Sequence, residues 1–568
     1  GIQNITSGTE LLNTAEHLYV AEMIQRAQSS HSQTLYYNPN AMDYDTDFVG
    51  DITEDNAPIQ NYNLTLSGGK ENMTFNINTN YFNQDGILRQ SGYDRFTTRA
   101  NVTLKKGKFD AFASIGMMHS NKEVEPWGLY EFSIFNGPYR PPVQSLPTTD
   151  NSVIIPGNNP DHVGYLSRLL NQEDDRVEDS YNVAANLKYE ILDGLVFQVN
   201  LGMNKWNYKR KFWQPQYLVY DEDGDINELG SRKDAILTEE YQESIKYTME
   251  NILSYTKSFG GVHNLSAMLG YTVEKTDRSN VRVEKRDFIS NSVQVFDGGS
   301  SLTGINGDDV YHRIVGKLAR IQYNFDGRYL FSASIRNDGS SNFGSESRYA
   351  WFPGASVGWN ISEEGFMQDA RRIDNLKLRA SYGEVGNQGI SPYLYSAYVD
   401  GNIDYVWGPE ASDELGAGAI QRGYGNPFVQ WETNISRNIG VDLLMFNGKF
   451  SFSADFYKND KQDMLLSVLL PASTGTTIPN DWKNHYNSKI TNVGDMVNKG
   501  IEISTSYKHR SSSGFNWSVA ATFTRNENEI TSLGDLDKIA LQDSKPGSWR
   551  ASQQDVTTYM IPGYEAGA

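Results

Sequence analysis

The run YLFSASIR at residues 329–336 alternates apolar and polar side chains along an extended segment. Its alternating apolar positions are Tyr329, Phe331, Ala333 and Ile335. An alternation with a period of two predicts a half-buried β-strand. The preceding run, residues 321–325, alternates in the same way and is separated from it by Asp326, Gly327 and Arg328. A three-residue connection between two such runs predicts a β-hairpin.

The next extended segment, YAWFPGASVGWN at residues 349–360, carries aromatic residues at both ends of one face and small residues between them. Trp351 and Trp359 lie on that face, so at roughly 3.3 Å per residue they are about 26 Å apart along a strand. A strand tilt of about 40° converts this into roughly 20 Å of depth, close to the apolar band between the two aromatic girdles of an outer-membrane barrel. The segment therefore favours a strand in contact with lipid, although a soluble β-sandwich also alternates.

The same alternation recurs from Asn61 onward and predicts roughly sixteen strands, many of them longer than the five or six residues usual in soluble sheets. Tight turns are expected at 68–72 (with Gly68 and Gly69), 106–108, 192–194, 259–261, 326–328, 446–448 and 509–514. Long loops are expected at 83–95, 119–179, 209–239, 275–308, 337–348, 386–433 and 461–490. Because tight and long connections alternate, one end of the sheet is short and the other elaborated, as in outer-membrane barrels with long extracellular loops. The predicted fold class is therefore an all-β, antiparallel transmembrane β-barrel.

The composition is compatible with a barrel and excludes several classes of function. A net charge of −20 argues against nucleic acid as a partner, because phosphate binding needs a basic surface. The absence of cysteine excludes thiol catalysis, cysteine-ligated zinc and disulfides. No apolar run approaches the roughly 18 residues of a transmembrane helix, and strands that alternate are consistent with a mean hydropathy of −0.56.

The polar face of the strands also needs water. In a closed barrel this water fills the lumen, and sixteen or more strands leave an interior too wide for side chains to fill. A pore or a plugged lumen is therefore expected.

Residues 9–28 hold the one segment with a helical pattern. Thr9 is a candidate N-cap, and the apolar face contains Leu11, Leu12, Ala15, Leu18, Tyr19 and Met23. Such a helix either packs on a loop or binds a partner.

Motifs for chemistry are scarce. Asp221, Asp223 and Asp225 resemble the start of a calcium loop with oxygen ligands at alternate positions, but Ile226 and Arg232 stand where an EF-hand needs Gly and Glu. An acidic solvent-exposed loop is the alternative. Neither HExxH nor a phosphate-binding GxxxxGK[ST] motif occurs, so the sequence indicates no enzyme, no cofactor and no firm metal site.

Tryptophans in the expected long loops are the remaining candidates for binding. They are Trp127, Trp213, Trp407 and Trp482. An exposed indole face stacks on sugar rings or peptide side chains, so these residues are predicted to contact substrate or a lid protein. Loop packing or an interfacial belt is the alternative for each of them.

Four runs resemble the barrel of SusC/RagA-type TonB-dependent transporters. They are NYNLTLSGGKENMTFNINTNYFNQDGILRQSGYDRFTTRANV (61–102), RYLFSASIRNDGSSNFGSESRYAWFPGASVGWNISEEGFM (328–367), NLKLRASYGEVGNQGI (375–390) and NVGDMVNKGIEISTSYK (492–508). The resemblance implies a barrel of about 22 strands with an N-terminal plug in the outer membrane of Gram-negative bacteria. It implies import of oligosaccharides or peptides, a SusD-like surface lipoprotein as a lid, and energy from the TonB complex.

The chain also departs from that pattern. No signal peptide, TonB box, plug or small N-terminal domain is recognised, and the ends of the chain resemble internal points of the barrel. We therefore expect residues 1–568 to form a partial barrel with unpaired strand edges that cannot transport by itself. A passive porin, a surface adhesin and a secreted carbohydrate-binding sheet protein are the alternatives, since loop residues alone do not identify a ligand.

Overall fold

The computed structural model describes residues 1–4, 11–27, 42, 44–135, 137–139, 152–154, 169–220, 225–226, 231–401, 405–406, 415–416, 418–469, 488–510, 514–537, 539–541 and 558–565. Within these ranges, every helix is too short or too polar to cross a bilayer.

Among the described residues, seventeen strands belong to one antiparallel sheet. They are β1 (Ile2–Gln3), β2 (Ala57–Lys70), β3 (Met73–Asp85), β4 (Gly92–Lys106), β5 (Phe109–Glu123), β7 (Glu173–Leu192), β8 (Leu195–Gln214), β10 (Ile236–Phe259), β11 (His263–Phe288), β12 (Gly299–Phe325), β13 (Tyr329–Ser340), β14 (Tyr349–Asn360), β15 (Ile373–Asn387), β20 (Glu432–Met445), β21 (Phe450–Leu469), β22 (Ser488–Arg510) and β23 (Asn516–Ser532). The expectation of roughly sixteen long strands is confirmed.

The connections contain shorter elements. The helices are α1 (Thr14–Ala27), α2 (Phe48–Ile52) and α3 (Leu129–Phe135), with 3₁₀ turns η2 (Phe296–Gly298), η3 (Ile361–Glu363) and η4 (Gly365–Met367). Four two-stranded pairs join β6 (Ser152–Ile154) with β9 (Leu218–Tyr220), β16 (Tyr398–Asp400) with β19 (Ile420–Gly423), β17 (Tyr405–Val406) with β18 (Leu415–Gly416), and β24 (Ile539–Leu541) with β25 (Thr558–Met560).

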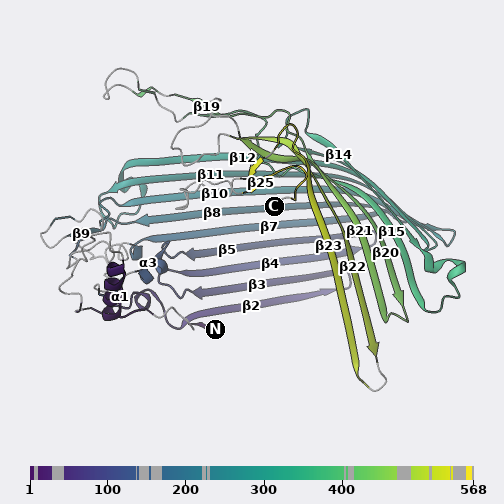
Figure 1. Cartoon of the computed structure of the whole chain (residues 1–568), viewed down its shortest axis with the longest axis horizontal. Helices are drawn as coiled ribbons and strands as arrows, with labels where there is room; N and C mark the ends of the chain where they lie inside the picture. Colours follow the sequence, from purple (N-terminus) through teal and green to yellow (C-terminus); the bar gives the residue numbers. More distant parts are fainter. Residues whose placement is uncertain are drawn as a thin grey trace. The chain divides into compact units, whose positions relative to one another are not determined.

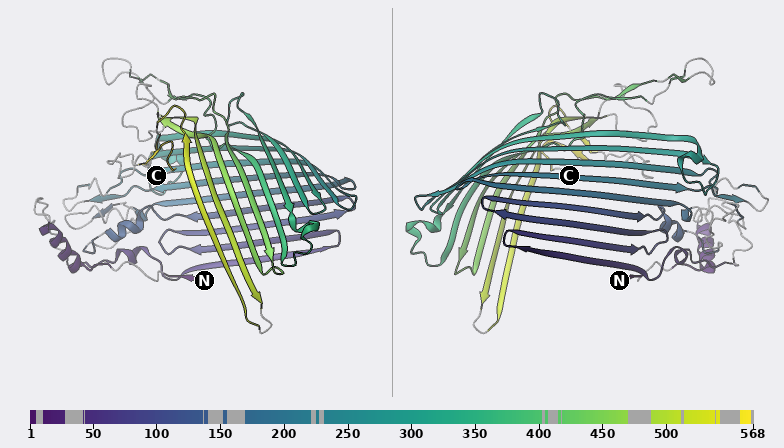
Figure 2. Two further views of the ribbon diagram at one scale, coloured as in Figure 1. Left: turned by 45° about the vertical axis from the view of Figure 1, so that its right-hand side comes forward. Right: turned by 180° about the vertical axis from the view of Figure 1, so that it is seen from behind.

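Contacts divide the chain into two compact units. The first holds 1–186, 201–247 and 276–310, and the second holds 187–200, 248–275 and 311–568. In the first unit β2 to β5 lie side by side, with α1 and α3 beside one end of these strands (Figure 1). In the second, β13, β14, β15 and β20 to β23 form one continuous ladder (Figure 2).

The predicted hairpin at residues 326–328 is confirmed. β12 ends at Phe325, β13 begins at Tyr329, and the backbone N–H of Arg328 donates to the carbonyl of Phe325 at 2.9 Å. Asp326 and Gly327 both adopt positive φ, at 54° and 68°, which an aspartate tolerates better than most residues and glycine adopts freely.

The turn expected at 68–72 is present, but the chain reverses three residues after Gly68 and Gly69. Both glycines pair within the ladder, opposite Phe75 and Thr74, and the chain reverses at Glu71 and Asn72 instead. A Cβ on Gly68 would stand 3.0 Å from the ring of Phe75, so the aromatic ring covers the backbone where the glycine lacks a side chain.

The exposure of β14 alternates as predicted. On the face of Trp351 and Trp359 these side chains are 61% and 37% exposed, and Val357 is 54% exposed. On the opposite face Phe352 is buried and its neighbours are partly covered. The strand therefore presents one apolar, uncovered face, as a lipid-facing strand does.

The alternation of tight and long connections is confirmed, but several loops are shorter than expected and one connection was missed; the loop expected at 83–95, for example, spans only 86–91. β11 continues to Phe288 and β12 begins at Gly299, so the long loop expected at 275–308 shrinks to ten residues, 289–298. The sequence prediction also missed the connection at 361–372, which lies at the tight-turn end because Trp359 pairs with Tyr329 there. The loop at 275–308 was predicted too long because the ends of β11 and β12 contain charged and glycine residues, which are typical of loops.

The helix predicted at 9–28 is shorter, and it is not the only one. Among the described residues it spans Thr14–Ala27, and the proposed cap Thr9 lies outside them. Asn13 caps the helix instead: its side chain accepts from the N–H of Glu16 at 2.9 Å, and its own N–H donates to the Glu16 carboxylate at 3.0 Å. This reciprocal pair is a capping box.

Candidate functional site

A pocket of about 720 Å³ lies where the long connections of the first unit meet the strand ends. Its lining comes from the segment after β5, the start of β7 and the end of β8, and includes Glu125, Trp127, Glu131, Asp174, Arg176, Arg210 and Arg232. This is the end of the sheet that carries the long connections. The volume falls within the range of sites for small ligands.

A small hydrophobic core holds this end of the unit together. Phe48 and Ile52 of α2 pack with Leu129 of α3, with Leu169 and Leu170 before β7, and with Tyr217, all of them buried. Gly128 precedes α3 with a φ of 79°, a conformation that favours glycine. The long connections are therefore packed structures at this end, and they fix the position of Trp127 beside α3.

Asp174 is the charged centre of the pocket. Arg210 donates two hydrogen bonds of 2.7 Å to its two carboxylate oxygens, and Arg176 donates two more of 2.9 and 3.3 Å. The guanidinium of Arg210 also lies 4.8 Å from the ring centre of Phe212. Bidentate pairs of this kind are among the stronger polar contacts in proteins, so the β7 and β8 ends are held rigidly together.

The protonation of these groups follows from their surroundings. Asp174 lies at the loop end of β7, before the apolar residues that begin at Tyr181. Burial raises the pKa of the Asp174 carboxyl, but the hydrogen bonds from Arg210 and Arg176 outweigh it and hold that pKa below its usual value. At the end of β5, burial next to Asp175 and Glu173 raises the pKa of Glu123.

Trp127 is the predicted binding residue that the structure places in this pocket. Its side chain is 80% exposed, and its ring meets Phe132 edge-on with centroids 6.4 Å apart. One face of the indole therefore remains open to a ligand. Three guanidinium groups and three carboxylates line the same pocket, so its charges balance and it suits a polar ligand without a large net charge.

Trp213 lies elsewhere than expected. It belongs to β8 and not to a loop, it is 1% exposed, and its ring packs edge-on against Phe288 at 4.9 Å. Ala235 and Leu237 complete this buried cluster, so Trp213 offers no open face to a ligand. Trp407 and Trp482 lie outside the described residues.

The calcium hypothesis has no structural support in the described part of the chain. Asp221 and Asp223 lie outside it, and Asp225 is exposed. Within the described ranges, no group of three or more His, Cys, Asp or Glu side chains is arranged to hold a metal ion.

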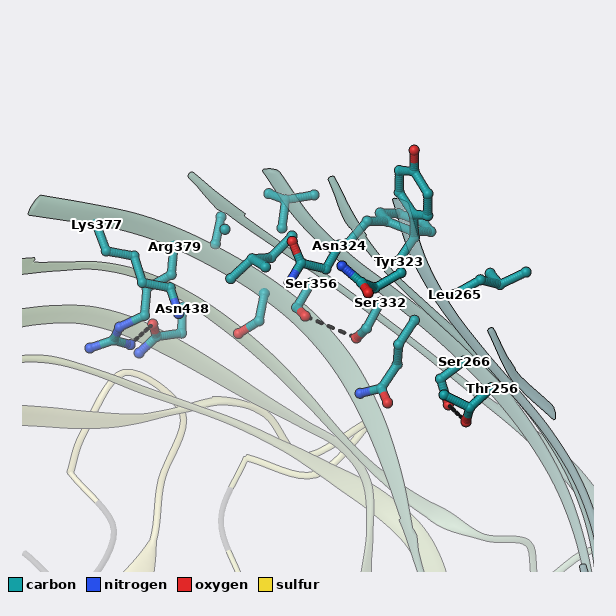
Figure 3. Close-up of a pocket in the computed structure, with 18 residues that line it drawn as sticks. Thr256, Leu265, Ser266, Tyr323, Asn324, Ser332, Ser356, Lys377, Arg379 and Asn438 are labelled. Carbon is teal, nitrogen blue, oxygen red and sulfur yellow. Dashed lines mark hydrogen bonds between the residues drawn. The ribbon is translucent and has the colours of Figure 1, made fainter. Parts of the chain in front are cut away.

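A second pocket, of about 520 Å³, lies on the polar face of the second unit (Figure 3). Ser332 and Ser356 share a hydrogen bond of 3.0 Å across β13 and β14, and Arg379 donates to Asn438 at 3.3 Å. Arg379 also donates two hydrogen bonds of 2.6 Å to Asp455 and two of 3.0 and 3.5 Å to Asp442. Sequence analysis did not single out these residues, although their alternation placed them on the polar face.

Comparison with known proteins identifies the family. The model of the TonB dependent receptor-like β-barrel matches residues 125–559. TonB-dependent receptor P3 of Formosa agariphila is 28% identical over 562 residues, covering 97% of this chain and 53% of the relative. TonB-dependent receptor P39 of the same organism is 30% identical over 84% of this chain and 43% of its own length. SusC of Bacteroides thetaiotaomicron is 25% identical over 83% of this chain and 47% of its own length.

A solved structure shows the same fold. The RagAB peptide transporter aligns with a TM-score of 0.73 at 20% identity, covering 99% of this chain and 62% of that chain. The present chain spans about half the length of the curated relatives it matches. On the match over most of its length, the chain belongs to the TonB-dependent receptor family, of whose β-barrel it forms a part.

Proposed function

We propose that this chain is the barrel part of an outer-membrane TonB-dependent importer that takes up oligosaccharides or peptides captured with a SusD-like surface lipoprotein. The observation that carries the proposal is the similarity to TonB-dependent receptors, including SusC, along nearly the whole chain. The likeness to the barrel of a peptide transporter supports the same fold. Transport by such receptors involves no bond chemistry, and no catalytic activity is assigned.

The pocket at the loop end is the proposed point of first contact with substrate. It lies at the end that carries the long connections, its charges balance, and Trp127 presents an indole face. Sugar rings and the side chains of peptides both stack on such a face. The guanidinium groups would then donate hydrogen bonds to a ligand without a large net charge, and the carboxylates would accept them, which orients the ligand.

The test is substrate uptake by a strain that lacks the chromosomal gene and carries the full-length receptor on a plasmid. Growth on oligosaccharides and on peptides as the only carbon source identifies the class, and a strain without TonB provides the energy control. If uptake needs the receptor but persists without TonB, the protein is a passive porin and not a TonB-dependent importer. Surface attachment without uptake would favour the adhesin.

Trp127→Ala tests the pocket. Losing one stacking contact of about 1 kcal/mol is expected to weaken substrate binding about fivefold. Phe135→Ala is the matched control, because Phe135 is also an exposed aromatic residue of this unit, 72% exposed, but does not line the pocket. Equal binding by wild type and the Trp127 variant, measured by calorimetry, would remove Trp127 from the site and leave the family assignment intact.

A further inference from the structure

Each of the strands β20 to β23 carries a basic residue on its outer face, on the long-connection side of its main apolar stretch. On the face shared with Trp359 these residues are Arg437 on β20, Lys458 on β21, Lys499 on β22 and Arg525 on β23, with Ile435 and Val497 two residues beyond Arg437 and Lys499. Arg437 stands directly opposite Lys458, and Lys458 directly opposite Lys499. The four residues, here called the basic row, are 47%, 52%, 57% and 70% exposed.

The basic row is only half neutralised by the carboxylates paired with it. Asp460 is shared by Arg437 and by Lys458, the latter at 3.0 Å. Glu527 is shared by Lys499 at 3.7 Å and Arg525 at 2.5 Å. Four cations with two ion-pair partners leave a surplus of two positive charges in a chain whose net charge is −20. Like charges directly opposite each other destabilise a sheet, so an anion bound to this row would stabilise it.

An apolar groove continues from the row toward the middle of the strands. It has a volume of about 780 Å³ and is lined by Val357, Ile439, Phe456 and Ile501 together with the basic row. Ile439 and Phe456 are 65% and 56% exposed. A groove with apolar walls and a cationic rim is complementary to a molecule with acyl chains and an anionic head.

The orientation of the groove indicates in which leaflet of the membrane a bound lipid would lie. The basic row lies on the side of the long connections, which is extracellular in outer-membrane barrels, and the apolar part of the groove extends toward the tight turns. Guanidinium groups bind phosphate oxygens through a planar fork, and lysines add point charges. We propose that the basic row binds the phosphate groups of a phosphorylated glycolipid of the outer leaflet, whose acyl chains occupy the groove. The proposal rests on the membrane placement of the barrel and is independent of what it imports.

The test is lipid retention by the purified full-length receptor, followed by native mass spectrometry after exchange into nanodiscs of zwitterionic lipid, with and without bisphosphorylated lipid A. Wild type is expected to keep the phosphorylated lipid. Lys458→Gln combined with Lys499→Gln removes two basic groups near the membrane surface, which is expected to weaken retention about 30-fold. Lys458→Arg with Lys499→Arg keeps the charge and is expected to retain the lipid.

The matched control is Lys105→Gln with Lys106→Gln, which makes the same change of charge next to the tight turn between β4 and β5. This pair is expected to retain lipid like wild type. Equal retention by the Lys458 and Lys499 glutamine variant, or equal retention of zwitterionic lipid by wild type, would overturn the proposal. Uptake assays on the same variants separate this outcome from a failure of the importer function.

Discussion

At the scale of single residues, Asp174 is the best-defined contact of the pocket, and the sequence did not reveal it. It is 9% exposed and accepts four hydrogen bonds from two arginines. Asp174→Asn removes the charge that pairs both guanidinium groups and is expected to lower the stability of the receptor by about 2 kcal/mol. Asp175→Asn, at the exposed neighbouring position, is the control and should unfold like wild type in a urea titration.

The same carboxyl predicts a dependence on pH. Its pKa is lowered in the folded chain, so its stabilisation is fully present above the usual aspartate value of about 4 and is lost as pH falls below that value. The difference in melting temperature between wild type and Asp174→Asn is therefore expected to be largest at pH 6 and to shrink as the pH falls below about 4. A difference that stays constant across this range would show that the shifted carboxyl is not Asp174.

The sequence predicted loop positions for Trp127 and Trp213, and of these two only Trp127 lines the pocket. Trp127 follows a strand and stays exposed, whereas Trp213 looks the same in sequence but continues the alternation of β8 into a buried cluster. The contact of Arg210 with Asp174 depends on the register between β7 and β8, because the two residues are 36 positions apart in sequence. A single sequence gives the alternation of each strand but not that register.

At the scale of elements, glycines on the polar face leave space for charged side chains to pass over the backbone of a neighbouring strand. The guanidinium of Arg379 passes over Gly440 to reach Asp455, and a Cβ on Gly440 would stand 2.5 Å from its central carbon. Gly440→Ala is expected to displace Arg379 and to cost about 2 kcal/mol through the weakened charged hydrogen bonds.

Gly383→Ala is the control for this change. Gly383 lies on the neighbouring strand β15, and a Cβ there meets nothing within 4 Å. The control is expected to unfold at the same urea concentration as wild type or slightly above it, because alanine restricts the unfolded chain. Equal loss in both variants would mean that strand propensity, and not the position of Arg379, determines the effect.

The aromatic boundary at the tight-turn end also belongs to this scale. The Tyr329 hydroxyl and the Trp359 indole N–H donate to one carboxylate oxygen of Glu364, at 2.6 and 2.9 Å. Trp359 was predicted to lie at a membrane boundary from its spacing to Trp351, but its partner Glu364 lies in the connection at 361–372, which carries no alternation and was missed. Tyrosine and tryptophan are common at the boundary between lipid and water, because their rings are apolar and their hydroxyl or indole N–H groups can form hydrogen bonds.

At the scale of the whole molecule, the fold class was predictable because each strand repeats the same constraint. One face is apolar and uncovered, the other is polar, and tight turns alternate with long connections; each feature was visible in the sequence and is present in the structure. The β-sandwich alternative is wrong, since the chain matches the barrel of TonB-dependent receptors. Strand ends were less predictable, because strands of more than twenty residues extend beyond the apolar band into polar sequence.

Lipid is expected to contact one face of these strands and water the other. On β22, Ile503 is on the apolar face and Ser504 is on the polar face, between Ser453 and Thr522. Ile503→Arg is expected to destabilise the folded receptor by about 3 kcal/mol, because an arginine near the middle of the bilayer is costly. Ser504→Arg adds the same side chain to the neighbouring residue on the polar face, near the acidic Asp442, and is expected to change stability little. Urea unfolding from lipid vesicles measures both. Similar losses in the two variants would mean that both faces meet the same environment, and the assignment of the apolar face to lipid would then be wrong.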